Sequence, residues 1–247
     1  MNTSPRNRKG FTLIELLTVI AIIGILAAVL FPGVQGVMRS AKKNSALNKL
    51  RSIGQGYMNW AGGKKSIAQV AWASGKTQTT TVAGYAAILA DGAALDSGEL
   101  WFLDADPAAD SIAVIPKNVI TKTGSTVSID AAFNTALAQG KSGWDLYTPT
   151  SRNLVGNVTA PLAWTRGLQA TDGTWPAAGT TAASSVWGTE GGHIVFGDGH
   201  VSWVSDTKAD ATSQNYFTKA DGTKSFSWKD SAGVPQGTPA AALVSNP

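Results

Sequence analysis

The sequence predicts an α+β protein in which a long amino-terminal α-helical spine is packed on a small antiparallel β-sheet head domain. Three observations predict this class. Residues 11–31 form an apolar run of 21 residues with a single charge. Residues 34–60 continue with apolar residues three or four positions apart, which is the spacing of an amphipathic helix. Residues 193–204 alternate in polarity around a Gly-Asp-Gly turn, as a β-hairpin does.

The same pattern divides the chain into four segments. A chain of 247 residues with 43% hydrophobic residues is long enough to fold one sizeable domain beyond the helix. We expect a polar leader over 1–10, a transmembrane helix over 11–31, an amphipathic helix extension over 32–62, and a globular α+β head with a loose tail over 63–247.

The apolar run is long enough to cross a membrane. At about 1.5 Å per residue it spans roughly 32 Å, the thickness of a bilayer core. Arg6, Arg8 and Lys9 lie just before it and predict a cytoplasmic amino end, although Arg39, Lys42 and Lys43 on the far side weaken that bias.

Glu15 is the unusual residue of the run, because a carboxylate in lipid costs several kcal/mol unless it is paired. A cut between Gly10 and Phe11 would create an α-amine four residues before Glu15, on the same helix face. Glu15 could then neutralise the terminus of its own chain or that of a neighbouring subunit. In the second case the pair would set an axial stagger between subunits.

Residues 9–15, with the sequence KGFTLIE, resemble the class III signal of type IV pilins and type II secretion pseudopilins. The resemblance covers about 25 residues. It implies that a membrane prepilin peptidase cuts after Gly10 and methylates Phe11, and that Glu15 acts in assembly. An ordinary secretory signal, with Leu26-Ala27-Ala28 as its cleavage site, or a plain signal anchor would share the hydropathy. Neither explains a Glu at the fifth position after the Gly-Phe junction.

Pro32 and Gly33 follow the apolar run directly. Proline removes a helical hydrogen bond and bends the preceding turn. We therefore interpret Pro32 as a joint that lets the helix leave the membrane and repack in a filament. A simple helix end is the alternative.

An apolar stripe follows, and it predicts which helix face packs on the head. Its members are Ala46, Leu50, Ile53, Tyr57 and Trp60, with Lys42, Lys43, Lys49 and Arg51 off the stripe. The sequence Ala61-Gly62-Gly63 predicts the end of the helix.

Charge and cysteine content exclude some functions. The pI near 9.3 suggests a nucleic-acid partner, but eight of the 20 basic residues lie in the leader and helix. Residues 61–247 hold 12 basic and 15 acidic residues, so no nucleic acid is expected to bind the head. The chain has no cysteine, which removes disulfides and favours a pseudopilin over an adhesive pilin.

The middle of the chain is harder to interpret. Residues 85–90 predict a short helix ended by Asp91-Gly92, residues 131–137 a second helix stopped near Gly140, and residues 99–103 a strand or a helix turn. Later, residues 162–165, 186–187, 216–217 and 225–228 are short strand candidates. We expect most of the nine tryptophans to fill the core, with a carbohydrate-binding face as the alternative.

The best hairpin is centred on the turn Gly197-Asp198-Gly199. With Asp198-Gly199 as a two-residue type I′ turn, Phe196 faces Val201, Ile194 faces Trp203, and all four share one face. The stretch resembles a carboxyl-terminal Phe-x-Asp-Gly signature of a large group of pilin-like proteins. The chain departs from that group at position 188, which is Gly where many members have His.

Metal binding in the head has little support from the sequence. In this register His193 and His200 lie on one face about 13 Å apart, which is too far for both to bind one ion together with Asp198. Another register would place the two histidines on opposite faces. Major pseudopilins carry calcium in a late loop, and the resemblance therefore suggests Asp198, Asp206 and Asp210 as candidate ligands, without an EF-hand spacing. We expect no cofactor, with calcium as an open possibility, and we identify no catalytic residue, so the chain is not predicted to be an enzyme.

The resulting expectation is a structural subunit that begins as a single-pass inner-membrane protein with a periplasmic head. Its partners would be prepilin peptidase, membrane lipid, an inner-membrane assembly platform and further copies of itself in a helical filament. The first hypothesis is a periplasmic type II secretion pseudopilus. The alternative is a type IV pilin, major or minor, of a surface filament for adhesion, motility or ligand capture. A membrane-anchored enzyme has only the unassigned residues 64–150 in its favour.

Overall fold

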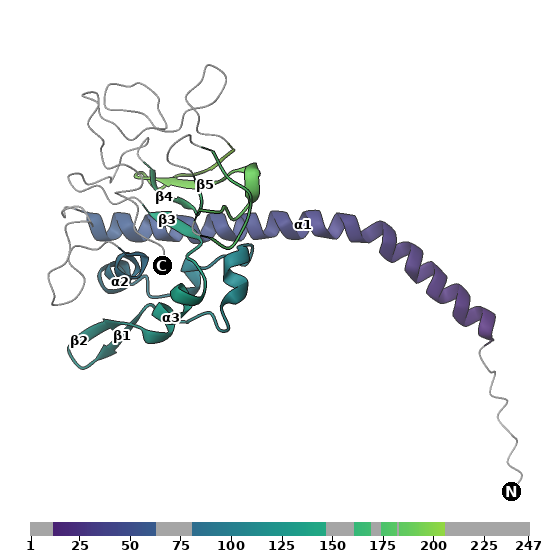
Figure 1. The fold of residues 1–247 in the computed structure, drawn as a ribbon, viewed down its shortest axis with the longest axis horizontal. Helices are drawn as coiled ribbons and strands as arrows, with labels where there is room; N and C mark the ends of the chain where they lie inside the picture. The colour runs from purple at the N-terminus through teal and green to yellow at the C-terminus, as the bar shows by residue number, and fades with distance from the viewer. Residues whose placement is uncertain (1–11, 63–80, 147–160, 169–173, 182, 206–247) are drawn as a thin grey trace, which may run out of the picture. The chain divides into compact units, whose positions relative to one another are not determined.

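The computed structural model describes residues 12–62, 81–146, 161–168, 174–181 and 183–205 (Figure 1). The chain divides into two compact units, residues 1–43 and residues 44–247. Helix α1, Leu13–Ala61, contributes its first part to one unit and its last part to the other. The expected α+β class is confirmed, because this long helix accompanies antiparallel β-sheet.

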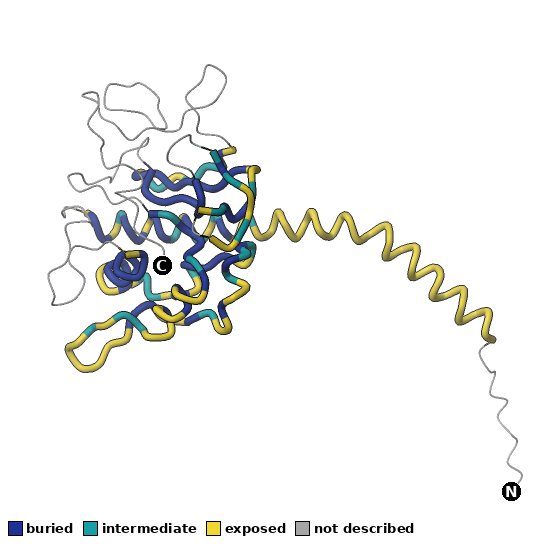
Figure 2. The backbone as a smooth tube through the Cα atoms, in the orientation of Figure 1, coloured by how far each residue is buried: buried dark blue, intermediate teal, exposed yellow. Residues whose placement is uncertain are grey.

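The part of α1 in the first unit carries no buried residue. Every residue from Thr12 to Lys42 is exposed, and this part is yellow throughout in Figure 2. The helix is continuous through Pro32, so the alternative of a helix end at that position is wrong. The role of Pro32 as a joint in assembly stays a prediction.

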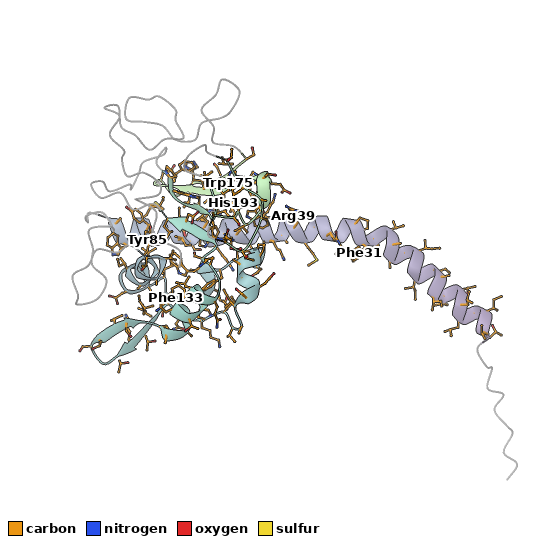
Figure 3. The ribbon with its side chains drawn as sticks, in the orientation of Figure 1. Phe31, Arg39, Tyr85, Phe133, Trp175 and His193 are labelled. Carbon is orange, nitrogen blue, oxygen red and sulfur yellow. The ribbon has the colours of Figure 1, made fainter. Side chains whose placement is uncertain are left out.

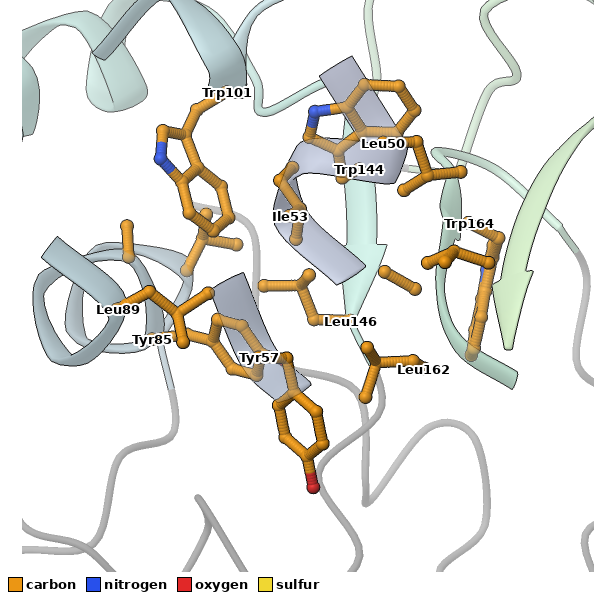
Figure 4. Packing of buried hydrophobic residues seen from close by; sticks show 14 of the residues in the cluster. Leu50, Ile53, Tyr57, Tyr85, Leu89, Trp101, Trp144, Leu146, Leu162 and Trp164 are labelled. Atoms are coloured by element: carbon orange, nitrogen blue, oxygen red, sulfur yellow. The ribbon is translucent and has the colours of Figure 1, made fainter. Parts of the chain in front are cut away.

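The part of α1 in the second unit forms the centre of the head. The predicted stripe is confirmed, since Ala46, Leu50, Ile53, Tyr57 and Trp60 are all buried. In Figure 4, Leu50, Ile53 and Tyr57 lie between residues of helix α2 on one side and residues of the sheet on the other. The helix ends at Ala61, as expected.

Two glycines let α1 approach its neighbours closely. A Cβ on Gly54 would lie 2.6 Å from Cγ2 of Val195 in the sheet, and one on Gly56 would lie 2.9 Å from Cδ2 of Leu95. Both distances are shorter than a van der Waals contact. The backbone of α1 therefore touches side chains on two of its faces.

Helix α2 (Val82–Ala93) confirms the first helix predicted in the middle of the chain, although it does not end at Asp91-Gly92. Gly92 lies inside the helix and packs on the indole ring of Trp60, which leaves no room for a Cβ at this position. The left-handed residue after the helix is Ala94, with φ 56°.

The second predicted helix is α3 (Ala131–Gln139), which is capped by Asp130 and followed by Gly140. The 3-10 helices η2 (Gly98–Trp101) and η3 (Pro107–Ser111) precede it. Residues 99–103 are thus a helix turn and not a strand. The pair β1 (Ile120–Thr123) and β2 (Thr126–Ile129) forms a two-stranded hairpin that was not predicted.

The main sheet has the antiparallel order β3-β4-β5-β6. Its strands are β3 (Trp144–Leu146), β4 (Pro161–Thr165), β5 (Gly192–Phe196) and β6 (Val201–Val204). The strand predicted over 162–165 is confirmed. Residues 186–187 do not form a strand, and Trp187 is the residue before the 3-10 helix η4 (Gly188–Glu190). The candidates at 216–217 and 225–228 lie outside the described residues.

The β5–β6 hairpin exists, but its predicted register is wrong by one residue. His193 pairs with Trp203 and Val195 with Val201. The turn holds three residues, because the Gly199 amide donates to the Phe196 carbonyl while Gly199 has φ 87°. A type I turn that is followed by a left-handed glycine adds this one residue. Ile194 and Phe196 therefore share a face that excludes Val201 and Trp203.

The tryptophans confirm the expectation of a core. Of the seven in the described ranges, six are buried and Trp203 is half-buried, the six being Trp60, Trp101, Trp144, Trp164, Trp175 and Trp187. Figure 3 shows the crowding of side chains through the head around Tyr85, Phe133 and Trp175. These indole rings contribute to the packing of the head.

Candidate assembly site at the start of the long helix

The first turn of α1 is closed by a reciprocal pair of side-chain contacts between Thr12 and Glu15. The Thr12 amide and hydroxyl donate to Oε2 of Glu15, at 2.9 and 2.7 Å. The Glu15 amide donates to Oγ1 of Thr12 at 3.3 Å. This is a capping box, in which an N-cap Thr and a Glu three residues later satisfy amides that have no partner inside the helix.

The sequence contains the signal for this box, Thr-x-x-Glu at the start of an apolar helix. The box gives Glu15 a role in starting the helix, in addition to the proposed pairing with an amine. Gly10 and Phe11 lie outside the described residues. The cleavage between them and the contact of Glu15 with the new terminus therefore stay predictions.

An apolar surface follows this first turn. Sixteen large apolar side chains between Leu13 and Met38 are each at least 46% exposed. Phe31, labelled in Figure 3, is one of them, at 67%. Within the described ranges, α1 is the one helix whose length and composition would allow it to span a membrane. A helix that is apolar on all sides requires lipid or other helices around it.

The Gly197–Gly199 turn of the head does not assemble a metal site in the described residues. His200 Nδ1 lies 2.5 Å from Oδ1 of Asp198, and the His200 ring stacks on Phe196. His193 packs on Trp203, on the other face of the hairpin. The two histidines therefore cannot share an ion. No group of three potential ligands occurs among the described residues, and Asp206 and Asp210 lie outside them.

A buried ion pair in the head was not predicted. The side chains of Arg166 and Asp106 are both buried. Nη2 of Arg166 donates to Oδ1 of Asp106 at 2.5 Å, and Nε donates to Oδ2 at 3.3 Å. The remaining guanidinium hydrogens are donated to the carbonyls of Gly179, Thr181 and Ser184. All five N–H groups of the arginine are thereby used. The partners lie 60 residues apart in the chain, so no local pattern indicated the pair.

Asp145 completes this charged cluster. Its Oδ2 accepts a 2.8 Å hydrogen bond from the Gly167 amide. Burial raises the pKa of Asp145 to about 6, although the Gly167 amide and the charge of Arg166 act in the opposite direction. Burial also raises the pKa of Asp106, despite Arg166. The cluster holds the carbonyls of Gly179, Thr181 and Ser184 in place.

Comparison with known proteins identifies the amino-terminal segment alone. Residues 5–31 match the family described as the prokaryotic N-terminal methylation motif. A 36-residue stretch is 67% identical to the type IV wide pilus major component PilA4 of Thermus thermophilus and covers 15% of this chain and 28% of that protein. Over 50 residues the chain is 48% identical to the type IV major pilin protein PilA of Myxococcus xanthus, covering 20% of this chain and 22% of that protein.

A third relative is the fimbrial protein EcpB of Eikenella corrodens, 56% identical over 45 residues, which are 18% of this chain and 28% of that protein. The chain thus spans about a quarter of the length of the curated relatives it matches. No solved structure matches the chain. The chain therefore carries a prokaryotic N-terminal methylation motif within an amino-terminal segment that is similar to that of type IV pilins.

Proposed function

We propose that this chain is the structural subunit of a helical filament that is assembled from the inner membrane. The precursor is cut between Gly10 and Phe11 by prepilin peptidase and methylated at Phe11. Before assembly, the apolar half of α1 lies in the membrane, with the amino end in the cytoplasm and the head in the periplasm. An inner-membrane assembly platform then adds the subunit to the filament.

One observation carries this proposal: the exposed apolar surface of α1 coincides with the match to the methylation motif. A large apolar side chain gains about 1.5–3 kcal/mol when it leaves water. With sixteen such side chains, the segment would cost tens of kcal/mol in solution. Lipid covers it before assembly, and the same segments of neighbouring subunits cover it afterwards.

Glu15 has two successive roles in this scheme. In the capping box it accepts hydrogen bonds from Thr12 and starts the helix. After the cut, the α-amine of Phe11 in a neighbouring copy offers the carboxylate a charged partner, which an amide or hydroxyl does not. In a medium of low dielectric constant this pairing determines which stagger between subunits is stable.

Two substitutions separate these roles. Gln completes a capping box as Glu does, but it carries no charge. We therefore expect Glu15→Gln and Glu15→Val to be inserted in the membrane like the native chain, and both to fail to form filaments in electron micrographs. Normal filaments from Glu15→Gln would show that capping is the whole role of this residue.

The mature amino terminus gives an independent test of processing. Mass spectrometry of protein from cells with the peptidase should find a chain that begins at Phe11 and carries one added methyl group. Cells without the peptidase should keep the leader. A native chain that begins at Met1, or beyond Ala28, would contradict the proposal.

Two kinds of filament fit this subunit. The relatives are named as pilus and fimbrial proteins, which favours a type IV pilus on the cell surface, for adhesion, motility or ligand capture. The absence of cysteine favours a periplasmic pseudopilus for type II secretion. Immunogold labelling of sheared filaments and of intact envelopes distinguishes them, because a surface pilus appears in the sheared fraction and a pseudopilus does not.

A further inference from the structure

The part of α1 that lies in the head has a second, exposed face made mainly of amides. We call the amide face the residues Asn44, Asn48, Arg51, Gln55 and Asn59, which lie three or four positions apart and are all exposed. Solvent-facing helix positions are well served by Lys and Glu, whereas Asn is one of the poorer helix formers. Three asparagines in this face therefore indicate a use other than contact with water.

Arg51 is the one charge of the amide face. Between residues 44 and 61, α1 has no acidic residue that could pair with it. The nearby Lys49 is already engaged, because its Nζ donates to the Phe102 carbonyl at 2.9 Å and lies 3.9 Å from Asp104. Across the described ranges, Arg51 forms neither a side-chain hydrogen bond nor an ion pair, and its side chain is exposed.

The head also has a segment of opposite charge. Residues 91–110, which we call the acidic segment, contain six acidic residues and no basic one. Four of the six have partners in the chain: Asp91 with Lys122, Asp96 with the amides of Val119 and Ile120, Asp104 with Lys49, and Asp106 with Arg166.

The other two acids of this segment are Glu99 and Asp110. Both are exposed, and neither makes a hydrogen bond or ion pair within the described part of the chain. Asp110 also lies close enough to Asp106 to raise the pKa of that buried carboxyl. A cation beside Asp110 would relieve this repulsion between like charges.

We propose that the amide face of one copy binds the acidic segment of a second copy, with Arg51 paired to Glu99 and Asp110. The occupant is this same chain, so the inference rests on the proposed filament. The asparagines and Gln55 supply both donors and acceptors to the backbone and carboxylates of the neighbour. Because the two surfaces differ, the contact is heterologous, and repeating it builds an open helical array and not a closed dimer.

Cysteine pairs test the contact directly, since the chain has no cysteine of its own. Arg51→Cys combined with Asp110→Cys, or with Glu99→Cys, should give a ladder of disulfide-linked multimers when filaments are oxidised. The matched control is Arg51→Cys combined with Thr126→Cys, an equally exposed position on the β1–β2 hairpin, and it should stay monomeric.

Charge exchange tests the chemistry of the contact. An exposed ion pair changes an association constant by up to about fivefold. We expect Arg51→Glu to lower the yield of filaments by about two- to fivefold, and the addition of Asp110→Arg to restore it. A double variant that is no better than Arg51→Glu would show that the two residues do not meet.

The outcomes separate this inference from the function on which it rests. Filaments without a ladder from either cysteine pair, or a disulfide found only inside monomers, would overturn the contact and leave the filament proposal intact. No filaments from the native chain would overturn both. Ladders from both acidic positions and none from the hairpin control would establish the contact.

Discussion

The two parts of helix α1 differ in what surrounds them, although they form one continuous helix. Residues 13–34 are apolar on nearly every side and exposed, whereas residues 44–61 bury a single stripe and expose amides. The difference shows that helix formation does not determine the partner of a segment. The width of the apolar surface determines the partner. A helix that is apolar all round fits lipid or identical helices, whereas a helix with one apolar stripe fits the core of its own chain.

The largest expected effect comes from truncating the buried stripe. Ile53→Ala should lower the free energy of unfolding of the head by about 2–5 kcal/mol, because Ile53 is fully buried between α2 and the sheet. Ile22→Ala in the exposed half should leave head stability unchanged. Denaturant titration of the detergent-solubilised chain, followed by tryptophan fluorescence, measures both. Equal losses would show that the two halves share one core.

A pair of glycines gives the next test. Gly54→Ala would bring its Cβ to within 2.6 Å of Val195, and it should destabilise the head by about 1–3 kcal/mol. Gly24→Ala has nothing within 4 Å and should leave the head as stable as before. A Gly54→Ala chain that unfolds at the native denaturant concentration would mean that α1 and β5 are less closely packed than described.

The stability of the head, in which the second half of α1 is buried, should also depend on pH, through Asp145 in strand β3. Its folded pKa of about 6 lies above the ordinary value of 3.8, so between about pH 4 and 6 the folded state binds a proton that the unfolded state does not. The free energy of unfolding of the head should therefore fall as the pH rises through this window, by up to about 1.4 kcal/mol per pH unit. Asp145→Asn should flatten the dependence, and an unchanged slope in that variant would assign it to another group.

The smallest effect concerns helix caps. Thr81 caps α2 inside the head, with its side chain accepting from the Gly84 amide at 3.2 Å, and Thr81→Ala should cost about 1 kcal/mol of head stability. Thr12 caps α1 outside the head, and Thr12→Ala should change filament yield without changing head stability. Thermal unfolding of the head, measured for both variants, tests this difference in stability.

Much of the fold could be predicted because its signals are local. The buried stripe, helices α2 and α3 and strand β4 follow from periodicity and from nearby glycine or proline. The β1–β2 hairpin also had a readable signal, since Gly124-Ser125 separates two short β-prone runs and Gly124 has φ 62°.

Other features depend on details that the sequence does not display. The β5–β6 register depends on whether Asp198 takes a positive φ beside Gly199, as a two-residue type I′ turn requires; Gly199 does and Asp198 does not, and this shifts every cross-strand pair. The glycine at position 92 predicted a helix end, whereas in the structure this residue lies inside α2 and contacts Trp60. The Asp106–Arg166 pair joins distant parts of the chain, so only the tertiary structure reveals it. Of the candidate assembly site, the capping box was readable from Thr12 and Glu15, whereas the partner of Glu15 depends on a second copy.

The Arg166 guanidinium holds Gly179, Thr181 and Ser184 by their main-chain carbonyls, and not by their side chains. Any residue supplies such a carbonyl, so these bonds do not depend on which side chains the three positions carry. Thr180 and Ala183 are exposed neighbours of these anchored residues and could change in type without removing any of the three bonds. Evolution can therefore vary these two positions at little cost to folding.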